Sequence, residues 1–170
     1  MVEGIVNGFI NMFGFLGSVP FGKEITVFII SLMPILELRG GLLAASLLDI
    51  NGVVAYIVCI IGNIIPVPFI LWFMKKILDK MRDSKHFSHF AKWLDKKVEK
   101  RKGQLEKYGY LGLVLFVGIP LPGTGAWTGC LIASVLEMDK KKSFIAALLG
   151  ILMASIIMML ISYGVLKAII

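Results

Sequence analysis

The stretch Leu-Met-Pro-Ile-Leu-Glu-Leu-Arg-Gly-Gly at residues 32–41 decides the fold, because it places Glu37 and Arg39 inside an otherwise uncharged apolar run. A charged side chain near the centre of a bilayer costs at least about 2.5–3.5 kcal/mol, and such residues usually mark an ion or substrate path. The alternative is a structural ion pair that stabilises a turn. We therefore take Glu37 and Arg39 as the first candidates for a functional site.

The composition around this stretch is that of a membrane protein. The chain has 170 residues, of which 58% are hydrophobic, and its mean hydropathy is +0.87. About 20 apolar residues are needed for a helix to cross the hydrocarbon core. The uncharged runs Ile50–Met74 and Ser143–Leu166 meet that length. Ile25–Leu36 is too short, and Tyr108–Leu136 is too long for one span and is interrupted by prolines and glycines.

The two halves of the sequence align without a gap when one is shifted by 88 positions, which indicates an internal repeat. The identities at proline, glycine and serine carry most of the weight, because matches among apolar residues are common by chance. The aligned pairs include Pro34 with Pro122, Gly41 with Gly129, Ser46 with Ser134, Gly62 with Gly150, and the acidic pair Asp49 with Glu137.

Each repeat contains two short apolar segments separated by a proline and glycine break, followed by one long span. The short segments are too short to cross alone, so a re-entrant hairpin that enters and leaves on one face is expected. A hairpin plus one span is an odd number of crossings, so the second repeat must be inverted. We predict an all-α polytopic membrane protein with two inverted repeats, an architecture found in many secondary transporters. The expected segments are an interfacial or membrane helix in 1–22, repeat one in 23–74 (hairpin 25–48, span 50–74), a linker in 75–107, and repeat two in 108–170 (hairpin 108–136, span 143–166).

The linker 75–107 is strongly basic, with twelve Lys or Arg and five Asp or Glu, and so carries the whole net charge of +7. Basic loops stay in the cytoplasm, so we expect a multi-pass protein of the inner (cytoplasmic) membrane with this linker on the cytoplasmic side. Apolar residues at helical spacing predict a basic amphipathic helix that lies on the headgroups. Nucleic acid is the other partner for a basic patch and is disfavoured between two hydrophobic blocks.

The hairpin tips hold the remaining candidate residues. A helix begins after each tip, and its N-terminus attracts anions, so two such termini predict a pocket for phosphate or carboxylate. Arg39 adds a bidentate charge for the same ligands, and Glu37 is a candidate proton carrier if it is unpaired. Pro34, Pro120 and Pro122 are expected to break the helices. Further candidates for substrate contact are Gly123, Thr124, Gly125, Trp127 and Asn63.

Several chemistries are disfavoured by the residues present. Cys59 and Cys130 stand alone in apolar runs, which predicts buried thiols and no disulfide. His86 and His89 lack a third ligand, so no metal site is expected, and no cofactor motif is found. No catalytic set of residues appears, so we expect a protein that is not an enzyme.

The stretch 32–41 together with Ile-Pro-Leu-Pro-Gly-Thr-Gly-Ala-Trp-Thr-Gly at 119–129 resembles the small multidrug export protein family. That family is similar to a branch of the DedA/VTT (SNARE-associated) superfamily. The resemblance implies paired re-entrant hairpins, inverted repeats and a link to lipid handling and proton-dependent drug tolerance. It assigns the acidic membrane residue to Glu37 and the basic one to Arg39. DedA proteins typically carry arginines in the second hairpin, and this chain has none between Lys107 and Lys140.

These observations favour a secondary transporter or flippase for an amphipathic anion such as a lipid phosphate, with proton coupling through Glu37 and membrane lipids as partners. The alternatives are an exporter of small hydrophobic compounds and a scaffold whose hairpins bind lipid without transport. The chain is small for an enclosed pathway, which is compatible with a homodimer.

Overall fold

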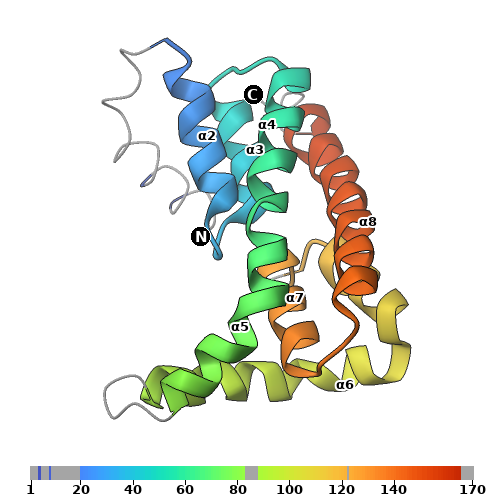
Figure 1. The fold of residues 1–170 in the computed structure, drawn as a ribbon. Helices are drawn as coiled ribbons and strands as arrows, with labels where there is room; N and C mark the ends of the chain where they lie inside the picture. Colours follow the sequence, from blue (N-terminus) through green and yellow to red (C-terminus); the bar gives the residue numbers. More distant parts are fainter. Residues whose placement is uncertain (1–3, 5–7, 9–19, 83–87, 122, 166–170) are drawn as a thin grey trace. The chain divides into compact units, whose positions relative to one another are not determined.

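The computed structural model describes residues 4, 8, 20–82, 88–121 and 123–165, and all secondary structure in these ranges is helical. Much of the predicted N-terminal helix, together with His86 and Pro122, lies outside the described residues. The chain forms two compact units, the first made of Met1–Ile65 and Ile151–Ile170 and the second of Pro66–Gly150. Figure 1 gives the helix labels used below.

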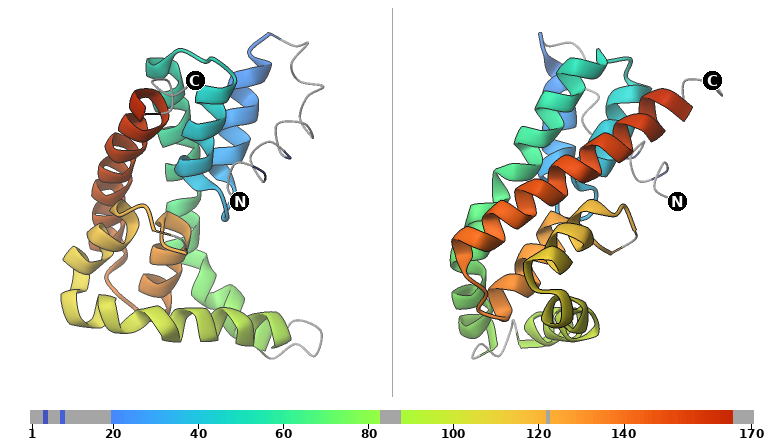
Figure 2. Two further views of the ribbon diagram at one scale, coloured as in Figure 1. Left: turned by 180° about the vertical axis from the view of Figure 1, so that it is seen from behind. Right: turned by 90° about the vertical axis from the view of Figure 1, so that its right-hand side faces the viewer.

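The first unit is a helical hairpin packed against the helix that follows it. Helices α2 (Gly22–Leu32) and α3 (Glu37–Leu47) form the hairpin, and α4 (Gly52–Ile64) packs against both (Figure 2). The last part of the chain completes the unit: the Ser46 hydroxyl donates to the carbonyl oxygen of Ser162 at 2.8 Å in the π-helical turn η2 (Leu160–Val165). Apolar side chains from these segments form a continuous buried core.

The second unit has the same components. Its hairpin is formed by the end of α6 (Ser88–Gly118) and by α7 (Ala126–Val135), and α5 (Pro66–Arg82) packs on α7. Helix α6 is broken at Gly109, where φ is 56° and ψ is −131°, close to the predicted boundary between the linker and repeat two. The beginning of α8 (Lys140–Met159) follows α7.

Glycine permits the closest helix contacts in both units, at positions that the 88-residue shift relates. A Cβ on Gly62 of α4 would lie 2.9 Å from the carbonyl oxygen of Phe28 in α2. A Cβ on Gly150 of α8 would lie 2.9 Å from the carbonyl oxygen of Val114 in α6. Each span helix therefore packs on the first helix of a hairpin through a surface that only glycine provides.

The ends of α3 and α7 also share one local geometry, 88 residues apart. Asp49 and Glu137 both have left-handed backbones, with φ of 54° and 55°. The N–H of Ile50 donates to Ala45 and that of Met138 to Ala133, both at 3.0 Å, as in a Schellman-type helix end. Asparagine or aspartate then begins the next helix in each case: Asn51 Oδ1 accepts from Val53 N–H, and Asp139 Oδ1 accepts from Lys142 N–H.

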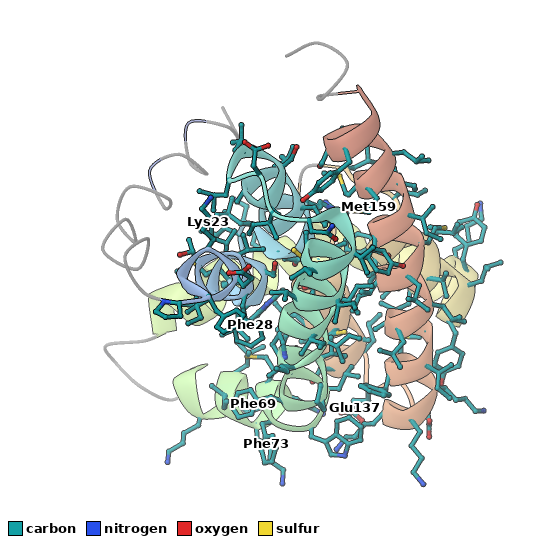
Figure 3. All side chains as sticks on the ribbon, turned by 90° about the horizontal axis from the view of Figure 1, so that it is seen from above. Lys23, Phe28, Phe69, Phe73, Glu137 and Met159 are labelled. Atoms are coloured by element: carbon teal, nitrogen blue, oxygen red, sulfur yellow. The ribbon has the colours of Figure 1, made fainter. Side chains whose placement is uncertain are left out.

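Within the described part of the chain, two helical stretches are long and apolar enough to cross a bilayer, Gly52–Lys80 and Lys140–Gly164, in agreement with the two predicted spans. Within Gly52–Lys80, α4 ends at Ile64 and α5 begins at Pro66. Large apolar side chains are exposed along both stretches, as expected for contact with lipid. Phe69 and Phe73, labelled in Figure 3, are about half exposed with ring centroids 5.3 Å apart. Other exposed apolar residues include Val53, Ile57, Ile61, Ile145, Leu149 and Ile156.

Candidate functional site

Glu37 is a buried carboxylate at the tip of the first hairpin. It is the first residue of α3, its side chain is 5% exposed, and its φ of 51° lies in the left-handed region. That conformation costs a residue with a side chain roughly 1–2 kcal/mol. The Glu37 N–H donates to the carbonyl oxygen of Met33 at 2.9 Å, which closes the turn. The fold thus maintains a buried acidic group on a strained backbone, a combination that clusters at functional sites.

Arg39 follows Glu37 on the same helix and is half-buried. The two charges attract each other even though they are two residues apart in sequence. On a regular helix this spacing directs side chains apart. The left-handed backbone at Glu37 departs from that regular geometry. The first tip therefore combines an acid and a base whose charges are coupled.

The turn before Glu37 has one exposed side and one buried side. Pro34 is exposed and Ile35 is 80% exposed, whereas Leu36 is 5% exposed. Helix α2 ends at Leu32, just before the proline that was expected to stop it. The tip therefore presents apolar surface outwards while it directs the carboxylate inwards.

The second tip is a turn that depends on glycine. Gly123 and Gly125 have φ of 79° and 137°, which other residues rarely adopt. Thr124 stabilises the turn through its hydroxyl, which donates to the carbonyl oxygens of Ile119 at 3.0 Å and Leu121 at 2.8 Å. Pro120 is half-buried and lies between α6 and α7. The hydroxyl of Thr124 is thus engaged within the loop, and Gly123 is the exposed backbone of the tip.

Asn63 and Trp127 lie on helices next to the tips. Asn63 of α4 is 3% exposed, and its Oδ1 has no hydrogen-bond partner among the residues that the structure describes, a costly state for a buried amide. Trp127 of α7 is half-buried. The structure thus brings Glu37 together with Arg39, and Thr124 together with the two glycines.

Sequence reasoning overlooked several buried hydroxyl groups of the first unit, among them that of Ser31. Its Oγ lies beside Gly41 and is fully buried near the Cys59 sulfur. The sequence did carry a signal for Ser31: it is a hydroxyl residue inside an apolar segment, and the next helix is rich in glycine. Ser31 fills the space that the missing side chain of Gly41 leaves, so it belongs to helix packing.

Cys59 and Cys130 are both buried free thiols. Among the residues that the structure describes, no three His, Cys, Asp or Glu side chains are grouped as metal ligands. The tips therefore offer a ligand the charges of Glu37 and Arg39, backbone groups and apolar surface.

The family model described as "Putative small multi-drug export protein" matches residues 37–157, from Glu37 at the first tip through the second tip and into α8. The chain belongs to this family. No curated protein and no solved structure matches it. The matched range of the small multidrug export family begins at the buried carboxylate, includes all of Gly52–Lys80 and ends within Lys140–Gly164.

Proposed function

We propose that this protein is a membrane transporter that exports small amphipathic molecules, and that Glu37 is the acidic group on which transport depends. The observation that carries the proposal is the burial of a carboxylate on a strained backbone in an apolar helical chain. A membership in the small multidrug export family supports the transport class. If Glu37 only formed a structural turn, glycine would adopt the same left-handed backbone with less strain, and glycine is the residue found at the second tip.

The two helix pairs are proposed to be re-entrant hairpins. Helices α2 and α3 have 11 residues each and α7 has 10, which gives about 15–17 Å at 1.5 Å per residue. The hydrocarbon core is roughly 30 Å thick, so each helix reaches about half-way. Broken backbone at that depth is tolerated where protein buries it or where it lines a wet cavity. This placement brings Glu37 to the middle of the membrane.

The repeats are proposed to be inverted. The chain passes from the first unit to the second along Gly52–Lys80, and it returns along Lys140–Gly164. Each unit thus combines a hairpin, the first part of its own span and the last part of the other span. In a pair of inverted repeats, the chain must run in opposite directions along the two corresponding spans. The basic segment 75–107 then faces the cytoplasm of an inner membrane.

A lipid phosphate is the second candidate substrate, since Arg39 offers a half-buried guanidinium next to the tip. Its planar donor geometry suits a phosphate better than a lipophilic cation. In this case Glu37 positions Arg39, and the protonation of Glu37 couples lipid movement to the proton gradient.

The test is transport by purified protein in proteoliposomes, with a fluorescent lipophilic cation and a fluorescent polyprenyl phosphate as separate probes. Glu37→Gln is expected to abolish movement of the true substrate while the protein stays folded. The matched control is Glu24→Gln, which removes a carboxylate from α2 of the same hairpin where it is half-buried. Movement of the cation identifies an exporter, and movement of the phosphate alone identifies a flippase.

Wild-type protein that folds and moves neither probe would refute transport and favour the lipid-binding scaffold. Transport that Glu37→Gln and Glu24→Gln reduce equally would refute the role of Glu37. Circular dichroism and gel filtration of each variant separate loss of transport from loss of fold.

A further inference from the structure

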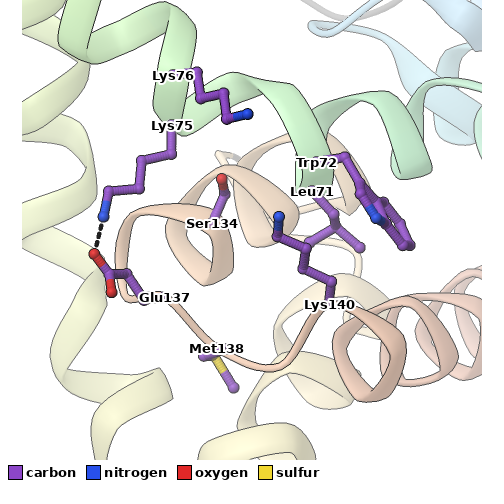
Figure 4. A pocket seen from close by; sticks show the side chains of 8 residues that line it. All are labelled: Leu71, Trp72, Lys75, Lys76, Ser134, Glu137, Met138 and Lys140. Carbon is purple, nitrogen blue, oxygen red and sulfur yellow. Dashed lines mark ion pairs between the residues drawn. The ribbon is translucent and has the colours of Figure 1, made fainter.

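A cavity of about 330 Å³ lies in the second unit at the base of its hairpin, where α7 ends and α8 begins. Figure 4 shows the side chains that line it and the ion pair between Lys75 and Glu137. The lining residues are Leu71, Trp72, Lys75 and Lys76 of α5, Ser134 of α7, Glu137 and Met138 of the connection, and Lys140 of α8.

The charges of the cavity leave a positive surplus. Three lysines face one carboxylate, so Lys76 and Lys140 supply two charges beyond the pair of Lys75 with Glu137. That pair is exposed, with side chains 43% and 67% accessible, and exposed pairs contribute only about 0–1 kcal/mol. A stronger anion can therefore displace the carboxylate. Phosphate is the anion that lysine ammonium groups commonly bind in proteins.

The position of the cavity along the two membrane-length helices selects a lipid as the source of this phosphate. Lys75 and Lys76 lie close to the end of Gly52–Lys80, and Lys140 is the first residue of Lys140–Gly164. The ends of such helices lie at the level of the headgroups. Trp72 is 36% exposed and packs edge-on against Phe144 with ring centroids 6.4 Å apart, and tryptophan is enriched at that level.

The first unit shows that the hairpin itself does not require these lysines. The positions 88 residues after Leu71, Trp72, Lys75 and Lys76 are Met159, Leu160, Tyr163 and Gly164, which line a cavity of about 490 Å³ in that unit. The position that corresponds to Lys140 is Gly52. The shared architecture therefore holds a cavity in each unit, and only the second one carries lysine at these positions.

We propose that the lysine cavity binds the phosphate headgroup of an anionic phospholipid, with Lys76 and Lys140 as its main contacts. Ser134 adds a hydroxyl, while Leu71, Trp72 and Met138 contact the apolar part of the lipid. Glu137 competes with the phosphate for Lys75. The site lies apart from Glu37 in the chain and goes beyond the proposed transport, because a lipid that binds here stabilises the second unit whether or not the protein carries a substrate.

The experiment titrates the full chain in neutral detergent with short-chain phosphatidylglycerol and follows the unfolding temperature. Short-chain phosphatidylcholine, glycerol phosphate and inorganic phosphate are the comparison ligands. Phosphatidylglycerol is expected to raise the unfolding temperature with saturation, and the double variant K76Q/K140Q to weaken its apparent affinity at least tenfold. The matched control K80Q/K141Q removes the same charge from lysines outside the cavity and is expected to change affinity less than twofold.

Glu137→Gln provides a test of opposite sign, because removal of the competing carboxylate is expected to tighten phosphatidylglycerol binding several-fold. This outcome requires only that the variant folds, so it holds even if K76Q/K140Q is unstable. The proposal would be overturned if phosphatidylcholine bound as tightly as phosphatidylglycerol, or if the two double variants weakened phosphatidylglycerol binding equally. Weaker phosphatidylglycerol binding by Glu137→Gln would also overturn it. If inorganic phosphate bound as tightly as phosphatidylglycerol, the claim that the bound phosphate belongs to a lipid would be overturned. The cavity would then be a site for the free anion.

Discussion

Alanine at Gly62 or Gly150 should destabilise the unit in which each glycine lies. The new methyl group at Gly62 would lie 2.9 Å from the Phe28 carbonyl oxygen and 3.0 Å from the Ser31 Cβ, so the two helices must separate by a few tenths of an ångström. Overpacking costs about 1–3 kcal/mol in general, and we take the upper part, about 2–3 kcal/mol, because the nearest atom at Gly62 is a backbone oxygen that cannot rotate away. The higher helix propensity of alanine returns about 1 kcal/mol. We expect a net loss of about 1–2 kcal/mol for Gly62→Ala and a similar loss for Gly150→Ala.

The two buried thiols provide a separate reporter for each unit. Cys59 lies in the first unit and Cys130 in the second, and both react with a maleimide dye only when their unit opens. Gly62→Ala in a Cys130→Ala background should raise the labelling rate of Cys59 about 5–30-fold, the factor that 1–2 kcal/mol gives. Gly150→Ala in a Cys59→Ala background should do the same for Cys130.

The matched control is Gly103→Ala in α6, where a Cβ would have no heavy atom within 4 Å. This change should leave labelling unchanged or slow it, because it gains helix propensity without a clash. Labelling of Gly62→Ala at the wild-type rate would refute the close contact of α4 with α2. A rate increase of the same size in Gly103→Ala would show that any alanine has this effect and would refute the packing argument.

Three further substitutions should change stability in predictable directions, each measured by thermal unfolding in detergent. Asp49→Gly and Glu137→Gly should each stabilise by up to about 1 kcal/mol, because glycine adopts their φ of 54° and 55° without strain; lower stability would contradict this. Asn63→Leu should stabilise by about 1 kcal/mol through removal of an unpartnered buried oxygen, and a loss of stability would point to an unseen hydrogen bond. Thr124→Val should destabilise by about 1 kcal/mol through loss of the hydroxyl's bonds to two carbonyl oxygens, with Thr124→Ser as the control that retains them.

The sequence predicted the helical class and both long spans because uncharged length alone determines which segments can cross a bilayer. Helices α2 and α6 end at Leu32 and Gly118, shortly before Pro34 and Pro120, which were expected to break them because proline lacks the N–H donor. The break of α6 at Gly109 was not predicted as such, because a single glycine in a polar segment does not reveal its φ. Burial of Glu37 was expected from its apolar neighbours, whereas its left-handed backbone was not readable from the sequence.

The sequence named candidate residues for the site, but it did not reveal their hydrogen bonds or which distant residues lie together. The Thr124 hydroxyl was treated as available to a substrate, and the structure shows it engaged with loop carbonyls, a short-range contact set by the turn. The lysine cavity was overlooked because Lys75 and Lys140 are 65 positions apart and each resembles an ordinary flank of a span. Only the packing of α5 on α7 brings them to one cavity.

The exchange of segments between the two units has a consequence for synthesis. The first unit requires the residues from Ile151 onwards, so its hairpin is made early and remains incomplete until the last helix emerges from the ribosome. Until then the α3 end that later accommodates Ser162 stays open to lipid or to other chains. Neither half of the sequence can complete a unit alone, and two separately expressed halves must find each other in the membrane before either one is finished. A premature stop directly after Gly150 therefore leaves the second unit with all of its residues and the first unit without its last segment.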